Sequence, residues 1–178
     1  VKILTFTLGI IFLDLLSFSE IPIYILFISI SLSSYFIIYS FFNFYPSRIM
    51  MSDIGSIPIG FLIGWITLVL IQNGQWQIPA FLLLYFYLDI FITWSIKLLK
   101  YESIFHRHND FAFHVALKKG INTNLYIIFI FFLGLLNFIL LVISVILGSI
   151  KFDILLLVCA LIINLFFIFF IRLKHTNF

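Results

Sequence analysis

The chain has 178 residues, of which 64% are hydrophobic and only 10% are charged, and its formal net charge is +3. A soluble domain is about half apolar and about a quarter charged, so these few charges could not cover a water-exposed surface. The composition excludes a soluble globular protein and predicts an integral membrane protein. Because the apolar runs are long and unbroken, they predict an all-α protein and exclude the alternating strands of a membrane barrel.

Six apolar segments are candidates for membrane-spanning helices, each of which needs about 20 mostly apolar residues. The first is short and interrupted by Asp14. We find no internal repeat and no linker, so we expect a single membrane domain over residues 1–178, a polytopic protein with about six transmembrane helices. In chain order the segments are residues 3–18, 21–42, 54–71, 78–98, 124–147 and 154–171.

The basic residues predict the orientation of these helices. Threading the six segments through a bilayer places nine of the ten Lys and Arg residues on one side and only Lys151 on the other. Since cytoplasmic loops carry the excess of Lys and Arg, the side with nine is the cytoplasmic one. Both termini, the break at residues 43–53 and the loop at residues 99–123 are then expected to be cytoplasmic.

Asp53 stands where the third apolar segment starts, in the run Ser52-Asp53-Ile54-Gly55-Ser56. By residue type alone, the simpler interpretation is a helix cap. The alternative is a site for phosphate and metal, because a helix N-terminus binds anions and Mg²⁺ takes one or two carboxylates plus substrate oxygens.

The loop at residues 99–123 contains three of the four histidines, but their spacing fits no zinc site. A basic loop at the membrane surface could bind anionic lipid headgroups. It could equally bind a nucleotide diphosphate. The residues in question are His106, Arg107, His108, His114, Lys118 and Lys119.

Polar residues inside the apolar segments are costly and should face the bundle interior. Asp89, with Thr93 one turn on, is either a functional residue or a partner in a structural hydrogen bond. Asn137 and Asn164 are expected to form interhelical hydrogen bonds. Asp14 and Asp153 lie near helix ends and are expected to reach water, and a G-x-x-x-G at Gly60 and Gly64 favours close helix packing.

The break between the second and third segments is similar in sequence to a motif of a known family. It reads Asn43-x-x-Pro46-x-Arg48-Ile49-x-Met51-Ser52-Asp53-Ile54-Gly55-Ser56. It resembles the N-x-P-P-A-K/R-I-F-M-G-D-V-G-S stretch of the polyprenyl-phosphate N-acetylhexosamine-1-phosphate transferases, called glycosyltransferase family 4. Farther on, this family has a helix with Asp and Thr, a G-E-x-x-W segment, a histidine-bearing loop and a glycine. Residues of this chain that fall in that order are Asp89, Thr93, Glu102, Phe105 and Gly120.

The resemblance implies an enzyme of the bacterial inner membrane that transfers a sugar phosphate from a UDP-sugar to undecaprenyl phosphate with Mg²⁺, in the synthesis of cell-envelope glycans such as cell wall or lipopolysaccharide. No nucleic-acid partner is expected. Asp53 would be the catalytic Mg²⁺ ligand, and Arg48 would lie near the lipid phosphate. The remaining substrate-binding residues implied are Asn43, His106, Arg107 and His108.

The register of the histidine loop leaves two alternatives. Counting without gaps from Glu102 and back from Gly120, His108 aligns with the first histidine of the family's A-H-R-x-H-x-Y-Q motif, and we prefer this register. A shifted register aligns His106 and Arg107 with the H-R pair but needs two extra residues before Gly120.

The departures from the family pattern concern one position of the motif, the histidine motif, which is eroded in either register, and the region before the motif. Ser52 replaces a glycine, and nothing in Val1 to Asn43 matches the family's D-D-x-x-D or N-x-x-N-x-x-D-G motifs. We therefore expect the C-terminal half of such an enzyme, either a fragment or one half of a split enzyme with a separate N-terminal partner. Because the N-terminal motifs are missing, we expect the chain alone to lack part of the active site and to be incomplete or inactive. Rival interpretations are a small transporter or channel subunit with Asp89 on its path, and a non-catalytic membrane assembly subunit.

Overall fold

The structure is a computed structural model that describes residues 2–15, 21–43, 52–99 and 111–173, and every structural statement below concerns these residues. They form eight α-helices and no strand, which confirms the predicted all-α class. In chain order the helices are α1 (Lys2–Leu15), α2 (Ile23–Asn43), α3 (Asp53–Gln72), α4 (Gln77–Leu82), α5 (Leu84–Leu99), α6 (Ala112–Lys118), α7 (Thr123–Leu147) and α8 (Ile150–Leu173).

Four of these helices are long and apolar enough to cross a membrane: α2, α3, α7 and α8. Helix α1 has only 14 residues, about 21 Å at 1.5 Å per residue, which is shorter than a hydrocarbon core of about 30 Å. The predicted helix at residues 78–98 is broken at Leu83 into α4 and α5, which was not anticipated. The polytopic membrane architecture is confirmed, with two of the six predicted segments short or broken.

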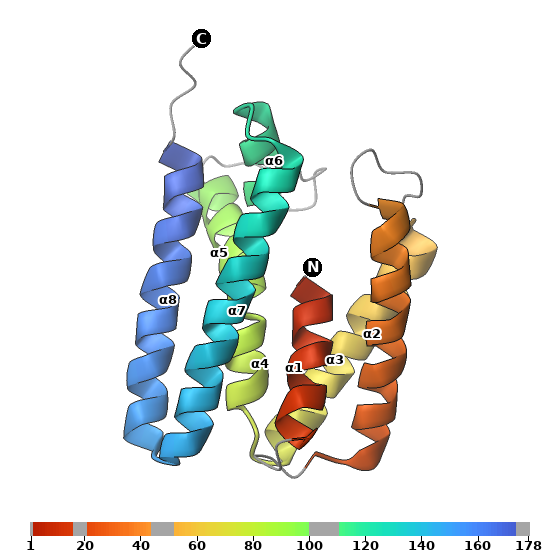
Figure 1. Cartoon of the computed structure of the whole chain (residues 1–178). Helices are drawn as coiled ribbons and strands as arrows, with labels where there is room; N and C mark the ends of the chain where they lie inside the picture. The colour runs from red at the N-terminus through yellow and green to blue at the C-terminus, as the bar shows by residue number, and fades with distance from the viewer. Residues whose placement is uncertain (1, 16–20, 44–51, 100–110, 174–178) are drawn as a thin grey trace.

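The helices run alternately up and down the bundle, except that α5 continues in the direction of α4 (Figure 1). Helix α3 begins at the end of the bundle where α2, α5 and α8 end and where α7 begins, and α6 lies at this same end. We call it the α6 end. The described basic side chains follow the predicted sorting: Lys97, Lys118 and Arg172 lie in the last turns of α5, α6 and α8, whereas Lys151 lies in the first turn of α8 at the opposite end.

The core forms around α1, which packs against α2, α4 and α7. Phe6, Ile10 and Leu13 of α1 are fully buried. Gly9 permits the close approach of α4, because a Cβ atom there would lie 2.6 Å from Leu82 Cδ1. Gly134 of α7 does the same for α1, since its Cβ would lie 3.3 Å from the side chain of Thr5.

The expected close packing at Gly60 and Gly64 is absent among the described residues. A Cβ atom at either glycine would meet nothing within 4 Å. Helix α3 is peripheral: three of its 20 residues are buried inside the described structure, against seven of the 25 residues of α7. Close packing in this chain therefore uses glycines on α1 and α7, where two helices cross.

Polar side chains join α7 to α8 at two levels. The amides of Asn137 and Asn164 bond to one another with N···O distances of 3.0 and 3.4 Å, which confirms the predicted interhelical pair. Near the opposite end from α6, Asp153 accepts hydrogen bonds from Ser144 (2.5 Å) and from Gln77 of α4 (3.3 Å). The expectation that Asp153 reaches water is wrong, because only 4% of it is exposed.

Candidate functional site

Asp53 is the first residue of α3 and is exposed. The N-cap is the preceding residue, Ser52, whose backbone is extended and whose carbonyl accepts hydrogen bonds from Gly55 (2.9 Å) and Ser56 (3.1 Å). No side-chain hydrogen bond caps this helix, so Asp53 does not have the cap role that residue type alone suggested. Its carboxylate lies in the favourable field of the helix N-terminus and faces outward from the described bundle.

Of the other predicted site residues, Asn43 is among those that the structure describes. Asn43 is the last residue of α2, so it lies at the α6 end, as Asp53 does (Figure 1). Arg48, His106, Arg107 and His108 lie outside the described residues.

A complete metal site is not present in the described part of the chain. It contains no group of three or more His, Cys, Asp or Glu side chains that could hold a metal ion. Asp53 offers a single carboxylate. This fits a Mg²⁺ ion bound through one or two protein carboxylates together with substrate phosphates, and it does not fit an all-protein metal cage.

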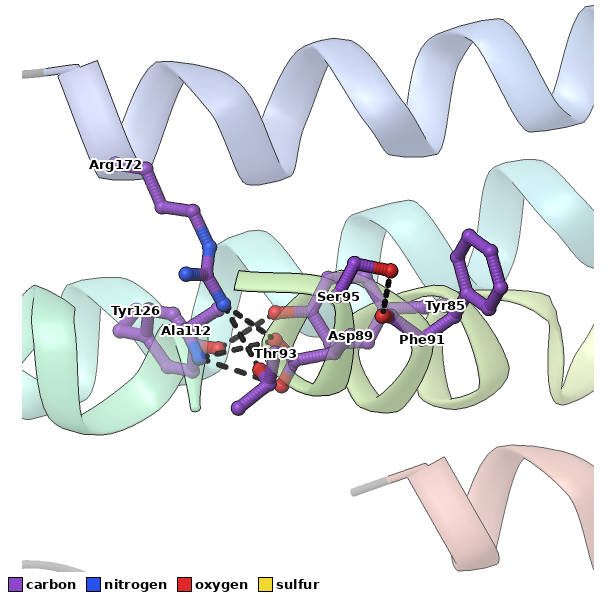
Figure 2. A network of polar contacts seen from close by, with 8 residues as sticks. All are labelled: Tyr85, Asp89, Phe91, Thr93, Ser95, Ala112, Tyr126 and Arg172. Carbon is purple, nitrogen blue, oxygen red and sulfur yellow. Dashed lines mark hydrogen bonds and ion pairs between the residues drawn. The ribbon is translucent and has the colours of Figure 1, made fainter. Parts of the chain in front are cut away.

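A second polar cluster at the α6 end centres on Asp89 (Figure 2). The backbone N–H of Ala112, the first residue of α6, donates to both carboxylate oxygens of Asp89, at 3.0 and 3.3 Å. Arg172 of α8 donates to the hydroxyl of Thr93 at 2.9 Å and lies 3.6 Å from Asp89 Oδ1. We call Asp89, Thr93, Ala112 and Arg172 the Asp89 cluster.

The Asp89 cluster is joined to α7 and α6 by further contacts. Tyr85 precedes Asp89 by one turn of α5, and its hydroxyl lies 2.7 Å from that of Tyr126 on α7. The ammonium group of Lys119, which follows α6, donates to the backbone carbonyl of Arg172. Side chains of α5, α7 and α8 thus meet the start of α6 and the lysine that follows it.

The Asp89 cluster satisfies its own charges. Asp89 and Arg172 are oppositely charged, and each side chain is 13% exposed. Because burial of an unpaired charge is costly, this pairing is what permits a carboxylate in an apolar helix. Both oxygens of Asp89 are engaged by groups of the chain itself, so Asp89 is poorly suited to bind a passing ion.

The sequence predicted only part of this cluster. It indicated that Asp89 needs a partner and that Thr93 lies on the same helix face, because residues four apart are neighbours on a helix. Arg172 could have been suggested as the partner, since it is the basic residue at the end of another apolar helix. The backbone donor at Ala112 left no signal, because any non-proline residue has an N–H group.

An apolar cavity of about 400 Å³ lies between α1 and α7, where its lining includes Leu8, Phe12 and Phe138. A smaller apolar cavity of about 140 Å³ lies between α7 and α8, near Phe129 and Phe167. Neither is lined by Asp89.

Comparison with known proteins finds one family. Residues 1–71 match the model of glycosyl transferase family 4, which is less than half of the chain. The matched region contains the stretch from Asn43 to Ser56, so the predicted resemblance is confirmed there; the histidine loop and the Asp89 cluster lie beyond it. No curated protein and no solved structure matches this chain.

Proposed function

We propose, on the premise that residues 1–71 belong to glycosyl transferase family 4, that this chain takes part in the transfer of a sugar-1-phosphate from a sugar nucleotide to a polyprenyl phosphate. The observation that carries the proposal is the position of Asp53. This carboxylate lies in the matched region, at a helix start and at the α6 end, and it is exposed where a substrate can reach it.

The proposed substrates are a UDP-N-acetylhexosamine and undecaprenyl phosphate. An oxygen of the lipid phosphate forms a bond to the phosphorus that carries the sugar, and the bond from that phosphorus to the bridging oxygen of UMP breaks. The products are a polyprenyl diphosphate sugar and UMP. The resemblance supports these identities, and it supports a bacterial inner-membrane protein of cell-envelope glycan synthesis.

Asp53 would contribute one carboxylate to Mg²⁺, and the substrate phosphates would contribute other ligands. The ion would neutralise the charge of the diphosphate. The N-terminus of α3 adds a favourable field for phosphate at the same place, because its first N–H groups point outward. Arg48, in the matched stretch, is proposed to lie near the lipid phosphate.

The test is Asp53→Asn, which removes the charge and keeps the size of the side chain. We expect transfer of labelled sugar phosphate to polyprenyl phosphate to fall on the order of a hundredfold, as for the loss of one charge-stabilising group in an active site. The melting temperature should hardly change, because an exposed carboxylate in a first helical turn contributes only about 0.3–1 kcal/mol.

The matched control is Asp14→Asn, the same substitution near the C-terminal end of α1, away from Asp53. This variant should retain activity. The assay is run with the chain alone and together with a candidate N-terminal half. Full activity of Asp53→Asn would contradict the proposal. So would the absence of UMP release from the unchanged protein with every candidate half.

A further inference from the structure

The smaller apolar cavity is a groove between the start of α7 and the end of α8, and we call it the α7/α8 groove. Its lining includes Leu125 and Phe129 of α7 and Phe167, Phe170 and Ile171 of α8. Leu125, Phe129 and Phe170 are about half exposed, so the groove opens on the outer surface of the described bundle. Because α7 begins and α8 ends at the α6 end, the groove lies at that end (Figure 1).

Two lysines stand where the groove ends. The ammonium group of Lys119 donates to the backbone carbonyl of Arg172, the residue that follows Ile171 of the lining. Ile121, another lining residue, follows Lys119 by two positions. Lys118 is the last residue of α6 and is exposed. The chain thus places positive charge beside the end of an apolar groove.

This combination suits a lipid with a negatively charged headgroup. The apolar lining accepts an acyl chain, and the ammonium group of Lys119 has three N–H donors, so it can bond to the Arg172 carbonyl and to a phosphate at once. Basic pockets between spanning helices on the cytoplasmic side bind anionic headgroups.

A nucleotide suits the groove less well, because the lining offers almost nothing to a base or a ribose. Among the described residues, Tyr126 is the lining residue with a polar side chain. Its hydroxyl already bonds to that of Tyr85 at 2.7 Å, on the inner side of α7. Of the two ligands considered for the basic residues that precede α7, the described structure therefore favours the lipid headgroup for Lys118 and Lys119.

We propose that the α7/α8 groove binds an anionic phospholipid of the bilayer, with part of an acyl chain between the two helices and the phosphate beside Lys118 and Lys119. The bound lipid would hold α6 against α8, because Lys119 directly follows α6 and already bonds to α8. The occupant is not the polyprenyl phosphate acceptor, since α8 and the start of α3, where Asp53 lies, are on opposite sides of the bundle (Figure 1). This inference does not depend on the proposed function.

The test compares the binding of two lipids to the full chain, freed of lipid in detergent, by native mass spectrometry. Dioleoyl phosphatidylglycerol and dioleoyl phosphatidylcholine have the same acyl chains and differ in headgroup charge, and we expect the first to bind at least about fivefold more tightly. Lys119→Gln should lower the affinity for phosphatidylglycerol about fivefold, as for the loss of one basic residue at a headgroup, and leave phosphatidylcholine binding unchanged. Lys119→Arg, which keeps the charge, should retain the preference.

The matched control is Lys151→Gln, which removes one positive charge in the first turn of α8, at the opposite end of the bundle, and should leave both affinities unchanged. Leu125→Trp fills the groove without changing its charge, so it should weaken the binding of both lipids by the same factor. Lys118→Gln serves as a second variant if Lys119→Gln does not fold. It should lower the affinity for phosphatidylglycerol by a similar factor.

Equal binding of the two lipids by the unchanged protein would overturn the proposal. So would an equal loss of phosphatidylglycerol binding in Lys119→Gln and Lys151→Gln, because the effect of charge would then not be local to the groove. Unaltered binding by Leu125→Trp would place the lipid elsewhere on the chain. Displacement of phosphatidylglycerol by a lower concentration of undecaprenyl phosphate would also overturn it, since the groove would then hold the acceptor.

Discussion

At the scale of single residues, three carboxylates of this chain differ in what surrounds them. Asp53 is exposed at the start of α3, whereas Asp89 and Asp153 are engaged by donors from other helices. A carboxylate in an apolar helix needs such donors, because lipid offers none. Their surroundings therefore suggest a substrate-facing role for Asp53 and architectural roles for the other two.

The sequence predicted some of these roles because residue type alone decides them. An asparagine in the middle of an apolar helix needs a hydrogen-bond partner, and Asn137 and Asn164 were predicted to bond between helices on that ground. The prediction that Asp153 reaches water was wrong, because it rested only on the position of Asp153 near a helix end. Its donors, Ser144 and Gln77, lie on other helices, which a reading of one helix at a time does not bring together.

The asparagine pair yields a prediction about stability. Asn137→Leu should lower the free energy of unfolding by about 1–2 kcal/mol, because it leaves the amide of Asn164 with only the carbonyl of Ala160 as a partner. The double variant Asn137→Leu/Asn164→Leu should cost less than the sum of the two single variants. Unfolding in mixed micelles measures all four proteins, and strict additivity would show that the two amides are not coupled.

At the scale of helices, the existence of the long helices could be predicted and their interruptions could not. Apolar length predicts α2, α3, α7 and α8 within a few residues of their bounds, because a bilayer dictates about 20 apolar residues. The break at Leu83 has no such signal: the apolar run continues through it. Helix α6 was not predicted, since it depends on Asp89 and Arg172, which lie far from it in the sequence.

Helix packing also yields a prediction, since a glycine packed against another helix and a glycine on an open face should respond oppositely to an added side chain. Gly9→Leu should destabilise the bundle by about 1–3 kcal/mol, because even a Cβ atom there would overlap the buried Leu82. Gly60→Ala should be neutral or stabilising by up to about 1 kcal/mol, because the site is open and alanine favours the helix.

Melting temperatures of the two glycine variants in one detergent provide the measurement. A strongly destabilised Gly60→Ala protein would mean that α3 packs closely against part of this chain or against a second copy. If that variant is stable but the N-terminal half no longer gives it transfer activity, the open face of α3 would be where that half binds.

At the scale of the whole molecule, the alternation of the helices brings the candidate site together. The start of α3, the whole of α6 and the last turns of α5 and α8 lie at one end of the bundle, with most of the described basic residues (Figure 1). The count of Lys and Arg predicted this grouping, because each helix that crosses reverses the side on which the next loop lies. It could not predict the depth at which Asp89 meets α6, which depends on side-chain packing.

The last prediction concerns which side of the membrane the α6 end faces. In a Cys159→Ser protein, which has no cysteine, Ser52→Cys and Gln72→Cys place one thiol at each end of α3. Both positions are exposed, so reagent access is decided by the membrane and not by packing. A membrane-impermeant maleimide applied from outside should label the cysteine at position 72 and spare the one at position 52 until the cells are opened.

Two arguments lead to this expected labelling pattern, one from charge and one from the proposed reaction. The excess of Lys and Arg at the α6 end favours retention of that end in the cytoplasm, and the family resemblance implies that the transfer takes place at the cytoplasmic face. Labelling of position 52 from outside would reverse the orientation, and it would place Asp53 on the face opposite to the one expected for the transfer. That single result would overturn both the orientation drawn from charge and the proposed transfer reaction, whereas labelling of position 72 alone leaves the Asp53 substitution as the decisive test.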